Sequence, residues 1–292
     1  MVVILTAIMI LCYTLQGLFS KLFADHYKKD SSTASLVFAM IFGAFISIAT
    51  LVIDGGSLSP SVLTICFAVI NGAMLVGYHM AHIGASMRGS YAIMSLCKLF
   101  GGIIVPMIVS MITLNQRLTG GQIVAVIIML ISFVLLNIQG ASLVGTKKGY
   151  WLCCILLALS NGCYGSVLSL QSGVMAGAER TEMICLSYAC SAVLAFLVLG
   201  LRRGKAVLSD FRMNTKAAGC AFGCGVVATL AVNLLLYLLS RGNTTVLNTL
   251  NNGGVLVCSS LFAVILFGEK LTKLQIVGLL MALCSIVMLS LS

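Results

Sequence analysis

The stretch RGSYAIMSLCKLFGGIIVPMIVSMITLNQRLTGGQIVAVIIMLISFVLLNIQ, residues 88–139, occurs twice in the chain. The second copy fills residues 241–292 at a constant offset of 153, without a gap, and 13 of the 52 positions are identical. Apolar helices match by chance more often than soluble ones, but composition does not explain matched polar residues. Arg-Gly opens both copies, and Leu-Thr-x-x-Gln follows the first helix of each. We interpret the match as a genuine duplication.

The composition is that of an integral membrane protein. The 292 residues are 60% hydrophobic and only 8% charged, whereas a soluble domain carries about a quarter charged residues. The formal net charge of +10 is dispersed over loops and lacks interleaved surface aromatics, which argues against nucleic-acid binding. The twelve cysteines are scattered through apolar segments, so we expect reduced thiols and neither disulfides, a metal site nor a cofactor.

Ten stretches are long and apolar enough to span a membrane as helices. They are residues 1–22, 33–53, 60–84, 90–113, 121–139, 149–171, 182–201, 216–240, 243–267 and 273–291. The duplicated pairs are the fourth and fifth and the ninth and tenth helices, so each half has five. The sequence therefore predicts a first repeat over 1–139, a connecting loop over 140–148 and a second repeat over 149–292. Because five is odd, the two repeats are expected to be inverted in the membrane, as in many secondary transporters.

A motif in the second copy resembles a known family. Phe267-Gly268-Glu269-Lys270-Leu271-Thr272-x-x-Gln275-x-x-Gly278 is similar to the motif that closes each half of the drug/metabolite transporter superfamily, in its ten-helix EamA-type branch. In the first copy the Gly-Glu of this motif is replaced by Asn115-Gln116. The resemblance implies a carrier with a central cavity between the halves, lined by the first, third, fourth, sixth, eighth and ninth helices.

Lys98 is the most informative single residue. It lies near the middle of the fourth helix, where a charge costs at least about 2.5–3.5 kcal/mol on insertion scales. No acidic residue falls at the middle of any of the ten stretches. We interpret Lys98 as part of a cavity wall that faces an anionic substrate or changes protonation. The structural alternative is a lysine that snorkels, or that loses its proton and hydrogen-bonds to neighbouring amides.

Other polar residues recur at helical spacing in apolar stretches, where they must find partners or line a wet cavity. The duplicate of the Lys98 face carries Asn248, Asn251 and Asn252. His79 or His82 could couple transport to protons, because histidine titrates near neutral pH, although a neutral histidine donating one hydrogen bond is the alternative for each. As substrate-binding candidates we take Lys98, Asn248, Asn251, Asn252, Asn71, Tyr78, His79, His82, Tyr13, Gln16, Tyr164, Asn233 and Tyr237.

Two indications of orientation disagree. Odd-numbered loops hold twelve basic residues: Lys28, Lys29, Arg88, Lys147, Lys148, Arg202, Arg203, Lys205, Arg212, Lys216, Lys270 and Lys273. Even-numbered loops hold three, Arg117, Arg180 and Arg241. Basic short loops stay in the cytoplasm, so the charges predict that both termini lie outside. The family resemblance implies that both lie inside.

These observations predict a secondary transporter rather than an enzyme. We expect it to move a small polar metabolite, anionic or zwitterionic, by alternating access of the two repeats, and to work as a monomer in the lipid bilayer of a bacterial-type cytoplasmic membrane. Coupling to protons and exchange of solutes are both open. The alternatives are a membrane-embedded enzyme acting on a lipid-linked substrate, which lacks paired carboxylates or a nucleophile–base spacing here, and an exporter of cationic drugs.

Overall fold

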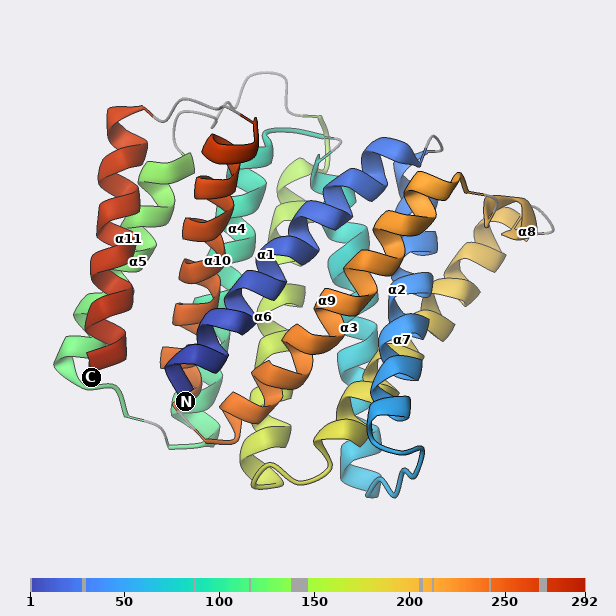
Figure 1. Ribbon diagram of the computed structural model, residues 1–292, viewed down its shortest axis with the longest axis horizontal. Coiled ribbons are helices and arrows are strands. Elements are labelled where there is room, and N and C mark those ends of the chain that lie inside the picture. Colours follow the sequence, from blue (N-terminus) through green and yellow to red (C-terminus); the bar gives the residue numbers. More distant parts are fainter. Residues whose placement is uncertain are drawn as a thin grey trace.

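The computed structural model describes residues 2–27, 30–86, 88–115, 117–137, 147–204, 207–211, 213–241, 243–267 and 272–291. Within these residues the chain forms ten long helices and one short one, without strands (Figure 1). They are α1 (Val2–His26), α2 (Ser31–Ile53), α3 (Val62–Ser86), α4 (Tyr91–Thr113), α5 (Gly120–Asn137), α6 (Tyr150–Val174), α7 (Arg180–Arg203), α8 (Val207–Asp210), α9 (Thr215–Leu239), α10 (Thr244–Phe267) and α11 (Lys273–Leu291).

The helix starts recur along the chain. α9, α10 and α11 begin at Thr215, Thr244 and Lys273, each 153 residues after the start of α3, α4 and α5. Figure 1 shows that α4 and α10 run in opposite directions, and so do α5 and α11. The helix pairings recur as well: α1 packs on α9 as α6 packs on α3, and α4 packs on α6 as α10 packs on α1.

The repeated Thr-x-x-Gln residues start a helix in both halves. In α5, the backbone N–H of Thr119 donates to Oε1 of Gln122 at 3.1 Å, and the backbone N–H of Gln122 donates to Thr119 Oγ1 at 3.3 Å. Thr272 and Gln275 make the same two bonds before α11, at 3.0 and 3.4 Å. This reciprocal arrangement is a capping box, which satisfies free N–H groups at a helix start. The Thr-x-x-Gln residues that the two copies share therefore mark the starts of α5 and α11.

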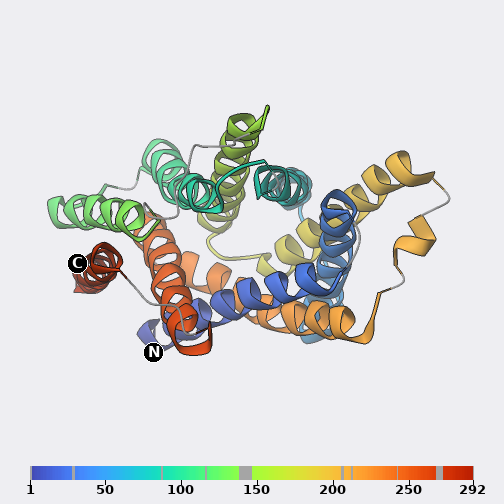
Figure 2. The ribbon, with the colours of Figure 1, turned by 90° about the horizontal axis from the view of Figure 1, so that it is seen from above.

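The bundle has two apolar cores. The larger one lies between α1, α2, α3, α7 and α9 and includes Phe23, Phe42 and Ile46. The smaller one joins α4 and α5 to α10 and α11 around Phe133 and Met129. Seen from above, α5 and α11 form one end of an elongated molecule, and α7 and α8 lie at the other (Figure 2).

The described helices are suited to a bilayer. Eight of them, α1 to α7 and α9, are long and apolar enough to cross a membrane, and α11 is a shorter apolar helix. Large apolar side chains such as Ile48, Ile112 and Leu201 are exposed on the outer surface, as expected for a surface in contact with lipid. The chain is an integral, multi-pass membrane protein.

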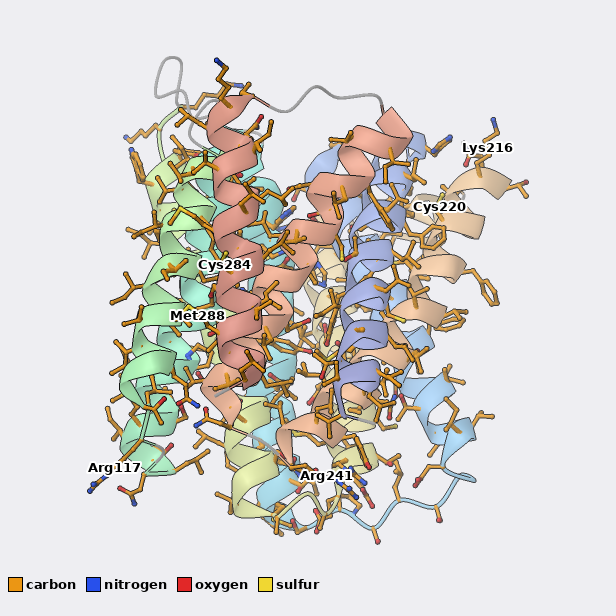
Figure 3. The ribbon with its side chains drawn as sticks, turned by 60° about the vertical axis from the view of Figure 1, so that its left-hand side comes forward. Arg117, Lys216, Cys220, Arg241, Cys284 and Met288 are labelled. Atoms are coloured by element: carbon orange, nitrogen blue, oxygen red, sulfur yellow. The ribbon has the colours of Figure 1, made fainter. Side chains whose placement is uncertain are left out.

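Charged side chains mark the two ends of the bundle. α1 begins and α11 ends at the same end (Figure 1), as an even number of crossings requires. Figure 3 shows Arg117 and Arg241 at this end, called here the terminal end, and Lys216 at the opposite end. The opposite end, called the basic end, holds the odd-numbered loops. Five of the basic residues counted there lie outside the described residues: Lys28, Lys29, Lys205, Arg212 and Lys270.

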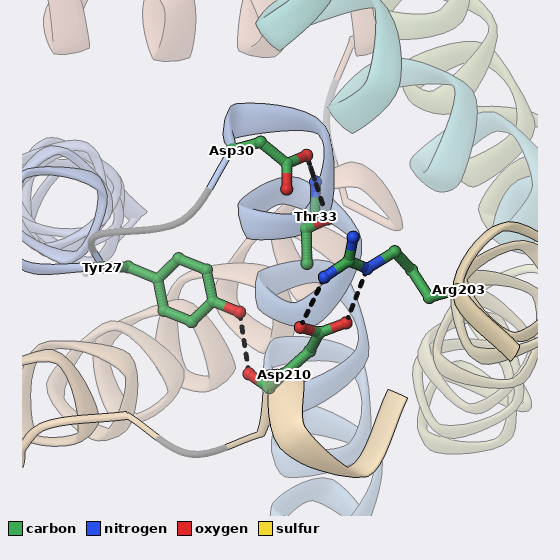
Figure 4. A network of polar contacts seen from close by, with 5 residues as sticks. All are labelled: Tyr27, Asp30, Thr33, Arg203 and Asp210. Carbon is green, nitrogen blue, oxygen red and sulfur yellow. Dashed lines mark hydrogen bonds and ion pairs between the residues drawn. The ribbon is translucent and has the colours of Figure 1, made fainter. Parts of the chain in front are cut away.

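A polar network at the basic end joins the end of α1 and the last turn of α7 to the linker between α7 and α9 (Figure 4). Arg203 donates from Nε and Nη2 to the two carboxylate oxygens of Asp210, at 3.1 and 3.3 Å, and Asp210 is 0% exposed. The Tyr27 hydroxyl donates to the Asp210 backbone carbonyl at 2.8 Å. Arg202 adds a bond to Ser32 Oγ at 2.7 Å. We call this set the basic-end latch.

The charge states at this latch follow from its geometry. The carboxylate of Asp30 caps α2 by accepting from the backbone N–H and the hydroxyl of Thr33, both at 3.0 Å. The bond from the backbone N–H holds the pKa of Asp30 below its ordinary value. Burial raises the pKa of Tyr27 to about 12. At neutral pH, Asp30 is therefore ionised and Tyr27 keeps the proton that it donates.

The terminal end has a corresponding connection. Glu179 Oε2 accepts from the backbone N–H and the hydroxyl of Ser61, at 2.9 and 2.8 Å. Thr181 Oγ1 donates to Asp54 at 3.1 Å. The loop between α2 and α3 is thereby tied to the start of α7, so the pair α2 and α7 is held at both ends.

The structure corrects several predicted boundaries. The first span was predicted to end at residue 22, but α1 continues to His26, whose Nδ1 lies 2.7 Å from the carbonyl of Leu22. α6 continues to Val174 rather than residue 171, and the 202–215 connection contains the unpredicted α8. Polar contacts stabilise these extensions, and a prediction from the length of apolar stretches does not include such contacts. Residues Gly268 to Leu271 of the family motif, and most of the predicted 140–148 loop, lie outside the described residues.

Candidate functional site

Lys98 lies beside the aromatic face of α3. Its Nζ is 5.4 Å from the centroid of the Tyr78 ring, a distance at which an ammonium is attracted to the ring face. The Tyr78 ring also contacts the imidazoles of His79 and His82, with centroids 5.3 and 5.9 Å apart. Lys98 is close enough to both imidazoles to interact with them electrostatically. All four side chains are half-buried, so α3 and α4 together form one wall that can carry a positive charge.

Close helix packing brings α6 and α10 to this wall. A Cβ at Gly101 would lie only 2.2 Å from the backbone oxygen of Ala158, so α4 and α6 touch along their backbones there. Beside this contact, Asn161 Nδ2 donates to the Lys98 carbonyl at 2.9 Å. From α10, Asn252 Nδ2 lies 2.9 Å from the Asn248 carbonyl and 3.4 Å from the Gly102 carbonyl. Backbone carbonyls near Lys98 are thus satisfied by amide side chains of the second half.

Tyrosines of both halves meet at the centre. The hydroxyls of Tyr164 on α6 and Tyr188 on α7 are 3.2 Å apart. The Tyr13 hydroxyl on α1 lies close enough to that of Tyr164 to interact with it, but no hydrogen bond of good geometry joins this buried hydroxyl to a residue that the structure describes. Cys12-Tyr13 and Cys163-Tyr164 occupy matching positions in α1 and α6, so the repeat places a tyrosine on both sides of the centre.

Further polar atoms at the centre are buried without a described hydrogen-bond partner. They are Gln16 Oε1 on α1, and Asn248 Nδ2 and Asn251 Oδ1 on α10. On α10, Gly254 packs against Ile10 of α1, whereas Asn252 bonds to the Gly102 carbonyl of α4, so α10 contacts both α1 and α4 near these atoms. A buried polar atom without a partner is costly. The set contains both donors and acceptors, which a small polar ligand could satisfy.

Three predicted residues lie elsewhere. Asn71 is 0% exposed and donates to Ser187 Oγ on α7 at 3.3 Å. Asn233 donates to the Thr229 carbonyl at 2.8 Å and to Thr50 Oγ1 on α2 at 3.4 Å. Tyr237 lies near the terminal end, against two arginine side chains. The other ten predicted residues lie on α1, α3, α4, α6 and α10, the helices that surround the centre.

The prediction missed two residues that the structure places at the centre. Asn161 is adjacent to the predicted face of α6, and Tyr188 belongs to α7, which was not expected to contribute. The recurrence of Cys-Tyr in α1 and α6 was a usable signal for the tyrosine cluster. All twelve cysteines are free thiols in the structure.

Comparison with known proteins identifies the family. Residues 150–291 match the model of the EamA-like transporter family. No curated protein sequence matches the chain. A solved structure titled "Crystal structure of protein" shares the fold with a TM-score of 0.76 and 15% sequence identity, over 99% of this chain and 97% of that one. The second half of the chain thus matches the EamA-like transporter family of the drug/metabolite transporter superfamily, and together with the ten long helices this match indicates a membrane transporter of small solutes.

Proposed function

We propose that the chain is a secondary transporter for a small anionic or zwitterionic metabolite, and that two inverted five-helix repeats, 1–139 and 149–292, expose its central site alternately to the two sides. The opposite directions of equivalent helices and their matching pairings support the inverted arrangement. Helices related by such a pseudo-twofold can exchange packing roles, which is how many carriers open first to one side and then to the other.

One observation carries the proposed substrate class: Lys98 on α4 accompanies amide and hydroxyl groups on α1 and α10 that are buried without a described hydrogen-bond partner. Tyr13 and Tyr164, whose hydroxyls lie near each other, are both half-buried. We propose that they border a space between the helices that water or a solute can fill. The ammonium of Lys98 would attract a carboxylate or phosphate there and repel a cation, because low polarity strengthens both effects.

The unpartnered atoms support a ligand with both kinds of hydrogen-bonding group. Tyr13 Oη and Asn248 Nδ2 can donate, whereas Gln16 Oε1 and Asn251 Oδ1 can accept. A zwitterion offers a carboxylate to the donors and to Lys98 and an ammonium to the acceptors. A purely cationic drug would satisfy only the acceptors and would face Lys98.

The packing differs between the two ends in a way that supports alternating access. α4 packs on α6 more extensively than α10 packs on α1, although these pairs are equivalent in the two repeats. Leu114 of α4 fills the space next to Gly173 of α6 at the terminal end. We propose that this conformation is closed at the terminal end, and that the opposite state forms when α10 closes on α1 and α4 separates from α6. We propose that the protein works in this way as a monomer, and that it does so in a bacterial-type cytoplasmic membrane.

Flux into sealed vesicles tests the function. Purified protein is reconstituted without any other protein and is supplied with radiolabelled anionic, zwitterionic and cationic metabolites, with and without a pH gradient. We expect saturable uptake of an unmodified anionic or zwitterionic solute, reduced in Lys98→Gln. Accumulation that follows the pH gradient and is lost when His79, His82 and Lys98 are replaced would assign proton coupling, and uptake driven only by solute on the other side would assign exchange. Chemical conversion of the solute, or selective uptake of quaternary ammonium compounds, would contradict the proposal.

A further inference from the structure

A second group of cationic side chains gathers at the terminal end, away from Lys98. The guanidinium of Arg241, just after α9, lies 4.5 Å from the centroid of the Tyr237 ring, and that of Arg180, the first residue of α7, lies 5.2 Å from it. Two like charges around one ring repel each other unless something between them is negative. Each stacking contact alone contributes little at a partly exposed position.

Nearby carboxylates do not neutralise the pair. Among the described residues, no ion pair joins Arg180 or Arg241 to an acidic side chain. The carboxylate of Glu179 accepts hydrogen bonds from Ser61, and that of Asp54 accepts one from Thr181. Glu182 lies two residues after Arg180 on α7, a spacing that directs the two side chains to different faces of a helix. None of these carboxylates therefore forms a direct ion pair with either guanidinium among the described residues.

The donors of the two arginines remain available. An arginine that stacks on a ring does so with its face, while its five N–H groups point outward in the guanidinium plane. No hydrogen bond from either guanidinium reaches a described residue. The duplicated arginine in the first half behaves differently, because Arg88 donates to the carbonyl of Gly84 at 2.8 Å. Gly84 is the repeat equivalent of Tyr237, so the second half has replaced a helix-capping contact with a ring that leaves the donors of its arginine free.

We propose that Arg180, Arg241 and Tyr237 form a second anion-binding site, at the terminal end of the bundle, where the outward N–H groups of the two guanidiniums hold a carboxylate or phosphate group. Planar N–H forks match such groups with paired hydrogen bonds. Arg180 and Tyr237 are half-buried and Arg241 is exposed, so the site opens to the membrane boundary. A free phosphate and the phosphate of an anionic lipid share this chemistry. The site does not depend on the proposed function, because it does not involve Lys98.

Isothermal titration with inorganic phosphate, in an uncharged detergent at low salt, tests the site. We expect the double variant Arg180→Gln/Arg241→Gln to bind phosphate at least about ten-fold more weakly than the unaltered protein, since each lost charged hydrogen bond is worth about a factor of ten or more. Arg117→Gln is the matched control, because it removes one exposed positive charge at the same end (Figure 3). Because phosphate can also bind at Lys98, the titration is repeated with Lys98→Gln in every variant, so that only the terminal-end site is measured. The Arg117→Gln control should bind within about two-fold of the unaltered protein.

A second measurement distinguishes lipid from free anion. The melting temperature is compared in nanodiscs of phosphatidylglycerol and of phosphatidylcholine, for the unaltered protein and the double variant. A gain in phosphatidylglycerol that only the unaltered protein shows, without phosphate binding in detergent, would assign the site to a lipid headgroup. Tyr237→Phe keeps the ring and should keep binding. If the double variant melts normally and both phosphate binding and the lipid effect are unchanged, or if phosphate binding disappears only in Lys98→Gln, the proposed site is wrong.

Discussion

Replacing Lys98 with glutamine removes one charge from the centre of the bundle and nearly preserves the length and polarity of the side chain. In the unaltered protein, Nζ lies 5.4 Å from the Tyr78 centroid and the side chain is half-buried, which leaves it able to meet a solute. A hydrogen bond to a charged group contributes about 1.5–3 kcal/mol. Loss of that bond should therefore weaken binding of a carboxylated or phosphorylated solute by roughly 10- to 150-fold. Lys98→Arg should also weaken binding, because a planar fork does not replace a compact ammonium at a tight site.

The assay is equilibrium binding of a transported solute to purified protein, with the melting temperature measured in parallel. Lys216→Gln is the matched control: it removes an exposed lysine at the basic end and should leave affinity unchanged (Figure 3). If Lys98→Gln melts normally and binds the anionic solute as tightly as the unaltered protein, Lys98 does not meet the solute as a cation. In that case it only hydrogen-bonds within the bundle, and cationic solutes become admissible.

Three further predictions concern stability and are checked by thermal unfolding in detergent. Gly101→Ala should lower the free energy of unfolding by about 1–3 kcal/mol, because the added methyl group meets the α6 backbone. In the control Gly17→Ala, nothing lies within 4 Å of the added atom, so stability should be unchanged or higher by up to about 1 kcal/mol. Equal effects of the two substitutions would contradict the close contact between α4 and α6. Asp210→Asn should cost about 1–2 kcal/mol, a value kept small because its partner Arg203 is 42% exposed. An unchanged melting temperature would show that the Arg203–Asp210 ion pair contributes nothing to stability. The Asp30 carboxyl has a lowered pKa in the folded chain, so its contribution to folding stability is complete above the ordinary carboxyl pKa of about 4 and is lost as the pH falls below that value. The difference in stability between the unaltered protein and Asp30→Asn should therefore shrink from pH 6 to pH 3. A difference that stays constant over this range would refute the prediction.

The sequence was sufficient to predict the helices, for a physical reason. Apolar length sets each span, and the repeated Thr-x-x-Gln residues are the capping boxes that start α5 and α11. The starts of α3 to α5 and of α9 to α11 accordingly differ by the same 153 residues as the sequence match. The ends of α1 and α6 were predicted less well, because polar residues extend both helices beyond their apolar stretches.

The candidate site was harder to predict. Helical spacing gives the direction of a side chain around its own helix, but not which neighbour covers it. Asn71 shares a stripe with Tyr78, yet α7 covers Asn71 and leaves Tyr78 beside Lys98. Asn233 likewise donates a hydrogen bond to Thr50 of α2. Tyr188 could not be found from spacing, because its role depends on the Tyr164 hydroxyl of another helix.

The pairing of α5 with α11 has a consequence for synthesis of the protein. α5 packs mainly on α11, where Ser285 Oγ donates to the Ala125 carbonyl at 2.6 Å and Gln275 Nε2 donates to the Leu136 carbonyl at 3.3 Å. α11 leaves the ribosome more than a hundred residues after α5. At about 5–20 residues per second, α5 waits in the membrane for roughly 7–30 s before its partner arrives. During that interval its buried face is open to lipid and to insertion factors, so truncation before Lys273 should leave α5 as the first helix available to membrane proteases.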